Sequence, residues 1–158
     1  MSARNVDIIV EIPKGSQNKY VWDTNRRRLR LDRVLHSSIH YPADYGVIAD
    51  TMAPDGRPVD VLLMVSIPTF PGCMVQGKIV GCLRTRDEKG LDIKIIAVPT
   101  HDPRLSAMES LNEIPPHSLK EIEYFFAAYK ELEGKSVEIE GWGDAIDAVS
   151  YVEQCRHA

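Results

Sequence analysis

The fold class of this 158-residue chain is decided by the run VDVLLMV at residues 59–65. The run is apolar except for Asp60, and β-branched valines stand at both of its ends. The turn residues PDG at 54–56 precede it, and Pro68 and Pro71 follow it. A compact apolar run bounded by turn residues predicts a buried strand. We therefore expect a core strand here, entered from a tight turn.

Further strands are predicted before this run. Residues 6–12 alternate loosely between apolar and charged side chains and end at a Pro-Lys-Gly break, which is typical of a half-buried strand. Residues 19–23 and 29–33 read as two short strands of a hairpin, with three consecutive arginines at 26–28 near its tip. A charge run of this kind is more typical of a solvated turn than of a binding patch.

Two more strands are predicted after the run. Residues 74–83 and 93–98 are rich in β-branched side chains, and the sequence DEKG at 87–90 between them has hairpin-loop composition. The middle of the chain is therefore expected to be mostly β.

Helical signals come late in the chain. Ser118 and Glu121 have the spacing of a capping box, which predicts a helix start. The apolar face of this helix then comprises Ile122, Phe125, Phe126 and Tyr129. A second helix is predicted over residues 144–155, with Ile146, Val149 and Val152 on one side. Short strands followed by two helices in the C-terminal part predict an α+β domain, mainly β, on a small closed sheet.

Composition limits the class of protein. The chain is 44% hydrophobic and 27% charged, which predicts a single globular domain over residues 1–158. A net charge of −4 gives no global attraction to nucleic acid or to an anionic membrane. Three widely spaced cysteines do not predict a disulfide framework or a zinc site. No long apolar segment is present, and we expect a cytoplasmic protein with no membrane partner.

Carboxylates fall at strand ends and turns of the predicted β region. They are Glu11, Asp55, Asp60, Asp87 and Asp92. A carboxylate buried within an apolar run must be paired or bound to metal. Asp60 is therefore expected either to bond to an arginine or a backbone amide, or to bind a metal ion. The sequence DGRPVD at 55–60 is open to two interpretations: a set of oxygen ligands for a hard cation such as Mg²⁺, or a β-turn with a capping aspartate.

Cations and phenols stand in the same parts of the sequence. They are Lys19, Arg33, Lys94, Lys130, Tyr41, Tyr45 and Tyr129. Hard-metal ligands combined with lysine, arginine and tyrosine suit phosphoryl transfer, because catalysis there consists mainly of positioning and charge neutralisation.

Five blocks of sequence strengthen this interpretation. EIPKGSQNKY at 11–20, LDRVLHSSIHYPADYG at 31–46, DGRPVDVL at 55–62, LDIK at 91–94 and FFAAYKELEGK at 125–135 occur in one order. This order and spacing resemble those of family I soluble inorganic pyrophosphatases, over about nine tenths of the chain. The resemblance implies an OB-like closed β-barrel with two flanking helices and Mg²⁺-dependent hydrolysis of pyrophosphate to two orthophosphates. It also implies a homo-oligomer, commonly a hexamer.

The resemblance also implies roles for individual residues. Asp55, Asp60 and Asp92 match the first metal site, and Asp60 also contacts the second metal. Glu11, Asp87 and Asp92 match the acids that hold the metal brought in with the substrate. Lys19, Arg33, Lys94, Tyr129 and Lys130 match the phosphate-binding groups. Tyr45 matches the tyrosine beside the metals and the nucleophile, so Tyr45, Lys94 and the position of Arg57 are the predicted catalytic positions.

Two positions depart from the family pattern. Arg57 stands where the family has the aspartate that is thought to take a proton from the attacking water, and Val21 stands where a glutamate is usual. Arginine cannot act as that base, because its pKa lies above 12. Arg57 either turns to solvent or makes bidentate bonds to phosphate oxygens. Neither His36 nor His40 is an obvious replacement base, since a histidine in an alternating strand more often packs or faces water.

These departures leave three classes of function to compare. The first is a pyrophosphatase slowed by Arg57, in which the cation itself still lowers the pKa of bound water. The alternative is a catalytically impaired paralogue that binds phosphate or pyrophosphate, or that regulates an active subunit. Oligonucleotide binding on an OB-like barrel needs a basic groove with stacking aromatics, which an acidic chain with three Phe and two Trp does not favour.

Overall fold

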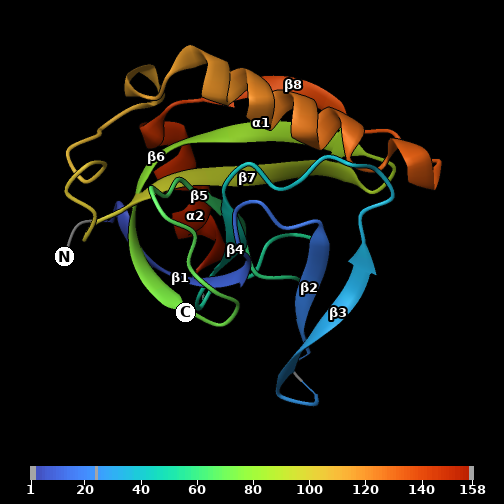
Figure 1. The fold of residues 1–158 in the computed structure, drawn as a ribbon. Coiled ribbons are helices and arrows are strands. Elements are labelled where there is room, and N and C mark those ends of the chain that lie inside the picture. The colour runs from blue at the N-terminus through green and yellow to red at the C-terminus, as the bar shows by residue number, and fades with distance from the viewer. Residues whose placement is uncertain (1–2, 24, 157–158) are drawn as a thin grey trace.

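The computed structural model describes residues 3–23 and 25–156, and its centre is a closed β-sheet (Figure 1). The strand order is β1-β4-β5-β7-β6-β8, and β1 also pairs with β6, so that five strands form a ring. The strands are β1 (Asn5–Ile12), β4 (Asp44–Ile48), β5 (Asp60–Leu63), β6 (Met74–Asp87), β7 (Gly90–Pro99) and β8 (Glu138–Gly143). The ring confirms the predicted OB-like closed barrel of an α+β, mainly β, chain.

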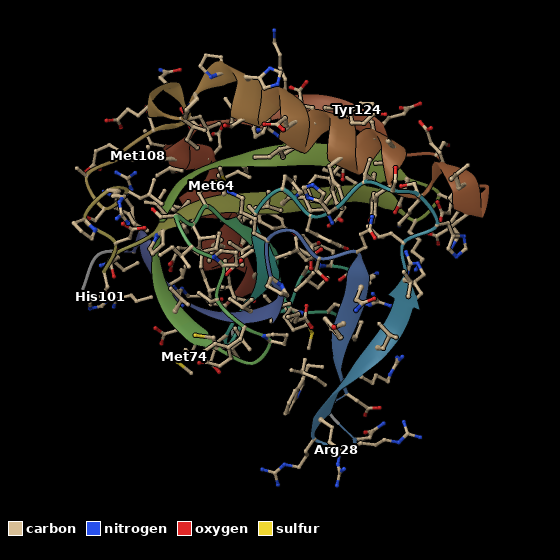
Figure 2. All side chains as sticks on the ribbon, viewed as in Figure 1. Arg28, Met64, Met74, His101, Met108 and Tyr124 are labelled. Carbon is tan, nitrogen blue, oxygen red and sulfur yellow. The ribbon has the colours of Figure 1, made fainter. Side chains whose placement is uncertain are left out.

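A hairpin stands apart from the barrel as a two-stranded sheet of β2 (Asn18–Asp23) and β3 (Arg28–Val34). It projects away from the barrel in Figure 1, and Figure 2 shows Arg28 at its far end. Trp22 pairs with Leu29 near this end, and Lys19 pairs with Arg33 near the barrel. The predicted hairpin is confirmed, and the arginines at 26–28 are exposed, as expected for a solvated turn.

The run at 59–65 is apolar because β5 is covered on both faces. Val61 and Leu63 belong to one buried cluster, inside the barrel and against α2 (Ala145–Cys155). Leu62, which points to the opposite face, belongs to a second cluster beneath α1 (Pro116–Ala128). Successive side chains of a strand point to opposite faces, so a strand that lies between two cores has apolar residues at consecutive positions instead of alternating apolar and polar ones.

Two strands were not predicted. β4 has the sequence DYGVI and contains Asp44, which is fully buried and accepts hydrogen bonds from the backbone N–H groups of Lys14 and Thr69 at 2.8 and 3.1 Å. A side chain at Gly46 would place its Cβ only 2.1 Å from the carbonyl oxygen of Ile9, so this strand requires glycine for close approach. β8 lies between the two helices, so the expected order of strands followed by helices is wrong there.

The helices differ from prediction in detail. α1 begins at Pro116 after Pro115, without a side-chain cap, so the capping box predicted at Ser118 and Glu121 is wrong. Proline near the start presets φ for a helix and needs no such cap. α1 does pack through Ile122, Phe125 and Phe126, as predicted.

The second helix begins where it was expected. The Asp144 carboxylate accepts a hydrogen bond from the N–H of Asp147 at 2.9 Å, which caps α2. The predicted apolar side is wrong at Ile146, whose side chain is exposed. The prediction is confirmed at Val152, which is buried together with Ala148 and Cys155, and Val149 packs partly buried against the same cluster.

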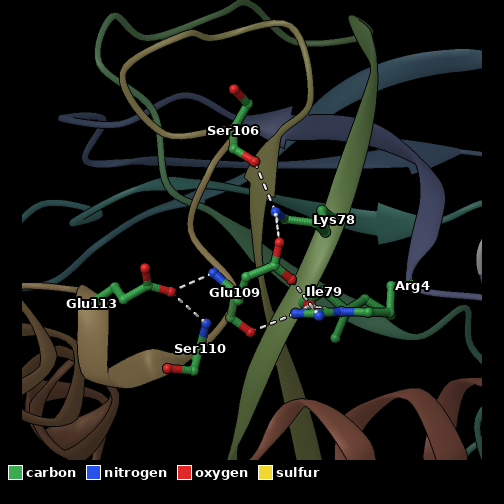
Figure 3. Close-up of polar contacts among 7 residues, drawn as sticks. All are labelled: Arg4, Lys78, Ile79, Ser106, Glu109, Ser110 and Glu113. Carbon is green, nitrogen blue, oxygen red and sulfur yellow. Dashed lines mark hydrogen bonds and ion pairs between the residues drawn. The ribbon is translucent and has the colours of Figure 1, made fainter.

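A polar network holds the segment before α1 against β6 (Figure 3). Arg4 donates to the carbonyl of Ile79 at 2.9 and 3.1 Å and forms an ion pair with Glu109 at 2.6 Å. Lys78 reaches the same carboxylate at 3.1 Å. Glu113 accepts a hydrogen bond from the backbone of Ser110 at 3.1 Å.

Among the described residues, no helix is long and apolar enough to cross a membrane.

Candidate active site

Lys94 is the centre of the candidate site. Its Nζ lies 2.8 Å from the Tyr45 hydroxyl, 2.7 Å from Oδ2 of Asp92 and 3.1 Å from Oδ2 of Asp60. The lysine is only 5% exposed, so a full positive charge is held inside the protein by two carboxylates. Asp60 is half-buried, and its partner is a lysine, which neither alternative drawn from the sequence had named.

Strand register brings these side chains together. β5 and β7 are parallel, with Val61 opposite Ile95, which places Asp60 beside Lys94 at one end of the pair. Asp92 is two residues before Lys94 on β7 and therefore points to the same face. Tyr45, on β4, pairs with Leu62 of β5. It therefore lies at the same end of the sheet, on the face that α1 covers.

The charges around Lys94 keep it protonated. Burial by itself lowers the pKa of the lysine, but Tyr45, Asp60, Tyr129 and Asp92 outweigh that effect, so the pKa lies well above its ordinary value. The ammonium also lies 5.3 Å from the ring centroid of Tyr45 and 5.2 Å from that of Phe126. Burial, followed by the charge of Asp60, raises the pKa of Tyr45, so this phenol stays neutral.

Burial and neighbouring carboxylates raise the pKa of two acids of the site, Asp92 and Glu11. Burial is the largest cause for Asp92, and the charges of Asp60 and Asp55 add to it against the opposing effect of Lys94. Burial also raises the pKa of Glu11, and Asp60 adds to this shift. Glu11 is the bulged residue of β1, and its Oε2 accepts a hydrogen bond from the N–H of Trp22 at 3.2 Å. A bound cation would relieve the repulsion among these carboxylates.

The turn before β5 carries Asp55 and Arg57 at the surface. Oδ1 of Asp55 accepts a hydrogen bond from the backbone N–H of Arg57 at 2.9 Å, and Gly56 has φ 84°, so the turn interpretation of this segment is confirmed. The Arg57 side chain is exposed and forms no ion pair within residues 25–156 or 3–23. Its charge nevertheless opposes, in small part, the rise in the pKa of Glu11, so Arg57 lies within electrostatic reach of that acid.

The hairpin supplies two cations at its barrel end. Lys19 and Arg33 face each other across β2 and β3. Burial, followed by the charge of Arg33, lowers the pKa of Lys19 to about 8. Arg33 forms ion pairs with Asp32 at 2.7 Å and with Glu133 at 2.9 Å. Val21, next on β2 after Tyr20, is half-buried and adds no charge.

The end of α1 supplies a further cation and a phenol. Lys130 lies 3.6 Å from Oδ2 of Asp87, which ends β6. Tyr129 is buried and stacks on Phe125 with ring centroids 5.2 Å apart. Asp87 is thus paired with Lys130, whereas Asp60 and Asp92 share Lys94. Three of the five predicted acids therefore have a cationic side-chain partner, and they fall into two groups with different partners.

Oxygen donors of this kind fit a divalent cation. The donor set is carboxylate only, which is what hard cations prefer, and burial holds Asp92 and Glu11 where charge neutralisation is favourable. In the part of the chain that the structure describes, no three acid, histidine or cysteine side chains yet converge closely enough to surround an ion. Lys94 occupies the position between Asp60 and Asp92 at present.

Some residues at the site were missed and others lie elsewhere. Asp32, Phe126 and Glu133 contact the predicted cations. All three lie within the family-like blocks of sequence, which were the signal that could have drawn attention to them, but no site role was predicted for them. His40 lines a hollow of about 730 Å³ beside α1, together with His117 and Tyr124. This hollow is not lined by the predicted carboxylates.

A buried lysine shared by two carboxylates beside a tyrosine, on a small closed barrel, suits phosphoryl transfer, which depends mainly on positioning and charge stabilisation. The sequence profile of the inorganic pyrophosphatase family matches residues 8–158. The chain belongs to this family, and specifically to its family I members.

Individual relatives agree with this assignment. The inorganic pyrophosphatase of Halalkalibacterium halodurans is 49% identical over 95% of this chain and 92% of its own length. That of Leifsonia xyli subsp. xyli is 51% identical over 93% and 91%. The crystal structure of the Thermus thermophilus inorganic pyrophosphatase superposes with a TM-score of 0.94 at 40% identity, covering 96% of this chain and 89% of the other. The Helicobacter pylori enzyme gives 0.94 at 35% identity, covering 98% and 92%.

Proposed function

We propose that this protein hydrolyses inorganic pyrophosphate to two orthophosphates and uses Mg²⁺ as its cofactor. The observation that carries the proposal is the Lys94 cluster, in which one buried ammonium is shared by Asp60 and Asp92 beside Tyr45. Membership of the pyrophosphatase family identifies the substrate, and the all-oxygen donor set favours Mg²⁺ over softer metals.

The carboxylates would form two overlapping sets of metal ligands. Asp55, Asp60 and Asp92 would form the first site, with Asp60 also contacting a second ion. Glu11, Asp87 and Asp92 would hold the metal that arrives with pyrophosphate. When bound, Mg²⁺ neutralises phosphate charge and lowers the pKa of bound water. The ion pairs with Lys94 hold the carboxylates of Asp60 and Asp92 on the same side of the barrel, where both could act as ligands.

The cations would bind the phosphates from three directions. Lys94 rises from the barrel, Lys19 and Arg33 from the hairpin, and Lys130 with Tyr129 from the end of α1. The pyrophosphate anion would replace the mutual repulsion of Lys19 and Arg33 by attraction to both. Tyr45 stays a neutral phenol, so it can donate a hydrogen bond beside the attacking water.

Arg57 sets the expected rate. An exposed arginine in the turn cannot accept the proton of the attacking water, and Val21 removes a second acid. General-base assistance is worth about 10²–10⁴-fold, so hydrolysis should be slow relative to family members with aspartate there. The same observation favours a second candidate function: an impaired paralogue that binds phosphate or pyrophosphate, or regulates an active subunit.

The resemblance also supports a single domain over residues 1–158, a homo-oligomer and most specifically a hexamer, in the cytoplasm. Exposed apolar side chains are consistent with an assembly that covers them. They include Ile67, Phe70, Met74 and Leu132.

The deciding experiment is phosphate release from pyrophosphate by the purified protein, with Mg²⁺ and with EDTA. We expect Mg²⁺-dependent release that EDTA abolishes. Pyrophosphate binding without release, in the parent and in Arg57→Asp alike, would favour the binding paralogue. Neither binding nor release would reject both functions.

A further inference from the structure

Arg33 is held by two carboxylates from distant parts of the chain. Its Nη1 lies 2.7 Å from Oδ2 of Asp32, its neighbour in sequence, and its Nε lies 2.9 Å from Oε1 of Glu133. The Glu133 side chain is only 9% exposed, whereas that of Asp32 is 29% exposed. The partner that is remote in sequence is therefore the buried one.

The contact between Arg33 and Glu133 is an ion pair without a well-directed hydrogen bond. Among the described residues, Nε of Arg33 and Oε2 of Glu133 are buried and have no hydrogen-bond partner. A buried carboxylate that is incompletely satisfied costs stability, and a whole buried ion pair can often be replaced by well-packed uncharged residues without loss of stability. The pair is thus a poor device for stability, and its attraction depends on charge.

Glu133 belongs to the same short turn as Lys130. The 3₁₀ turn Glu131–Glu133 follows α1, and the N–H of Glu133 donates to the carbonyl of Lys130 at 3.0 Å. Gly134, at φ 79°, ends the turn. One turn therefore carries Lys130 to Asp87 and Glu133 to Arg33, and it connects the end of α1 to the hairpin.

The hairpin needs such a connection. Two strands alone are marginally stable, and β2 and β3 form a sheet separate from the barrel. The side chain of Glu11 holds β2 at Trp22, and Glu133 holds β3 at Arg33. Without Glu133, the long Arg33 side chain would keep only its neighbour Asp32 as an ionic partner.

We propose that Glu133 is a positioning residue that aims the Arg33 guanidinium at a substrate phosphate and fixes its spacing from Lys130. The proposal rests on pyrophosphate being the substrate. It goes further, because it makes the affinity of the hairpin cations depend on a buried carboxylate about a hundred residues away in sequence.

The test is a double-mutant cycle of Glu133→Gln and Arg33→Gln, assayed for pyrophosphate hydrolysis. Glutamine keeps the shape of Glu133 and removes the charge on which the contact depends. We expect kcat/KM to fall at least fivefold in Glu133→Gln, with KM changing more than kcat, because misplacing a binding group by about 1 Å can cost up to 10²-fold. In the Arg33→Gln background, Glu133→Gln should change kcat/KM by less than twofold.

The matched control is Glu131→Gln, which removes the same charge from an exposed position in the same turn. It should leave kcat/KM within twofold of the parent. Thermal unfolding of each variant detects a merely structural role. An equal loss in both Arg33 backgrounds, a loss that follows a lowered Tm, or no loss in Glu133→Gln would each overturn the proposal.

Imidodiphosphate binding to the same proteins separates this proposal from the proposed function. If the parent protein binds this analogue but does not hydrolyse pyrophosphate, the pyrophosphatase function is rejected. The double-mutant cycle is then evaluated from the Kd of each variant for imidodiphosphate. Non-additive losses of affinity would then still support Glu133 as the residue that places Arg33, and additive losses would refute it.

Discussion

Lys19 and Arg33 lie directly opposite each other on the two strands of the hairpin, with no residue between them. Burial, followed by the like charge of Arg33, lowers the pKa of Lys19 to about 8. An anionic phosphate bound between Lys19 and Arg33 would offset the repulsion between them.

The first prediction concerns pH. Lys19 is charged below pH 8 and loses its proton above it, so affinity for imidodiphosphate should fall as pH rises through 8. Binding raises the lysine pKa again, so calorimetry at pH 8 in buffers of different ionisation enthalpy should show proton uptake. Lys19→Arg keeps its charge at all these pH values and should remove both effects. An unchanged pH dependence in that variant would assign the titration to another group.

The second prediction concerns Arg57. Restoring aspartate should raise kcat for pyrophosphate at least tenfold, about 1.4 kcal/mol, and should change imidodiphosphate binding much less. The reason is that a base acts on water in the transition state, whereas the cations bind the ground state. Arg28→Asp makes the same charge change at the exposed end of the hairpin (Figure 2) and should not accelerate hydrolysis.

The variant with both Arg57→Asp and Val21→Glu restores both missing acids and should be assayed in parallel, because Val21 alone can limit recovery. If the parent already turns over rapidly and neither variant exceeds it, another group supplies the base.

The third prediction concerns metal binding. Calorimetric titration of the free protein with Mg²⁺ should show one tight site, formed by Asp55, Asp60 and Asp92, and a weakened second site. The exposed Arg57 guanidinium near Glu11 opposes the second ion, since unit charges about 4 Å apart interact by roughly 4 kcal/mol at an effective dielectric of 20. Arg57→Asp should tighten the second site. Two tight sites in the parent protein would contradict this.

The fourth prediction concerns stability. Lys94→Gln leaves Asp60 and Asp92 without their shared cation, and the metal-free protein should lose about 2 kcal/mol, a value reduced because both acids are about a third exposed. Mg²⁺ should then raise the Tm of the variant more than that of the parent, because the ion neutralises the same carboxylates. An equal Mg²⁺ effect in both proteins would place the ion elsewhere.

Patterns in the chain predict the barrel better than its edges. The continuous run at 59–65 indicated a buried core strand, and two buried clusters cover its two faces. β4 escaped prediction because Asp44 and Gly46 are unfavourable in strands unless, as here, a loop binds the acid and a neighbouring strand approaches the glycine. Prolines, which the capping pattern does not include, set the start of α1.

The candidate site was predictable in its residue types but not in its pairings. Only register on β5 and β7 shows that Asp60 and Asp92 share Lys94, while Asp87 pairs with Lys130. Glu133 lies in a segment of ordinary surface composition, ELEGK, and its burial against Arg33 arises from a contact between distant parts of the chain. No local pattern encodes such a contact.

The double pairing of β1 has a consequence for how the chain folds during synthesis. Asn5 to Ile9 pair with Lys78 to Met74, so the ring closes across about 70 residues of intervening chain. Contacts of this sequence separation slow folding, because loop-closure entropy is lost before they form. β7, which carries Lys94, is released still later and fits between β5 and β6. In a nascent chain, Asp60 therefore lacks its lysine partner until β7 has left the ribosome.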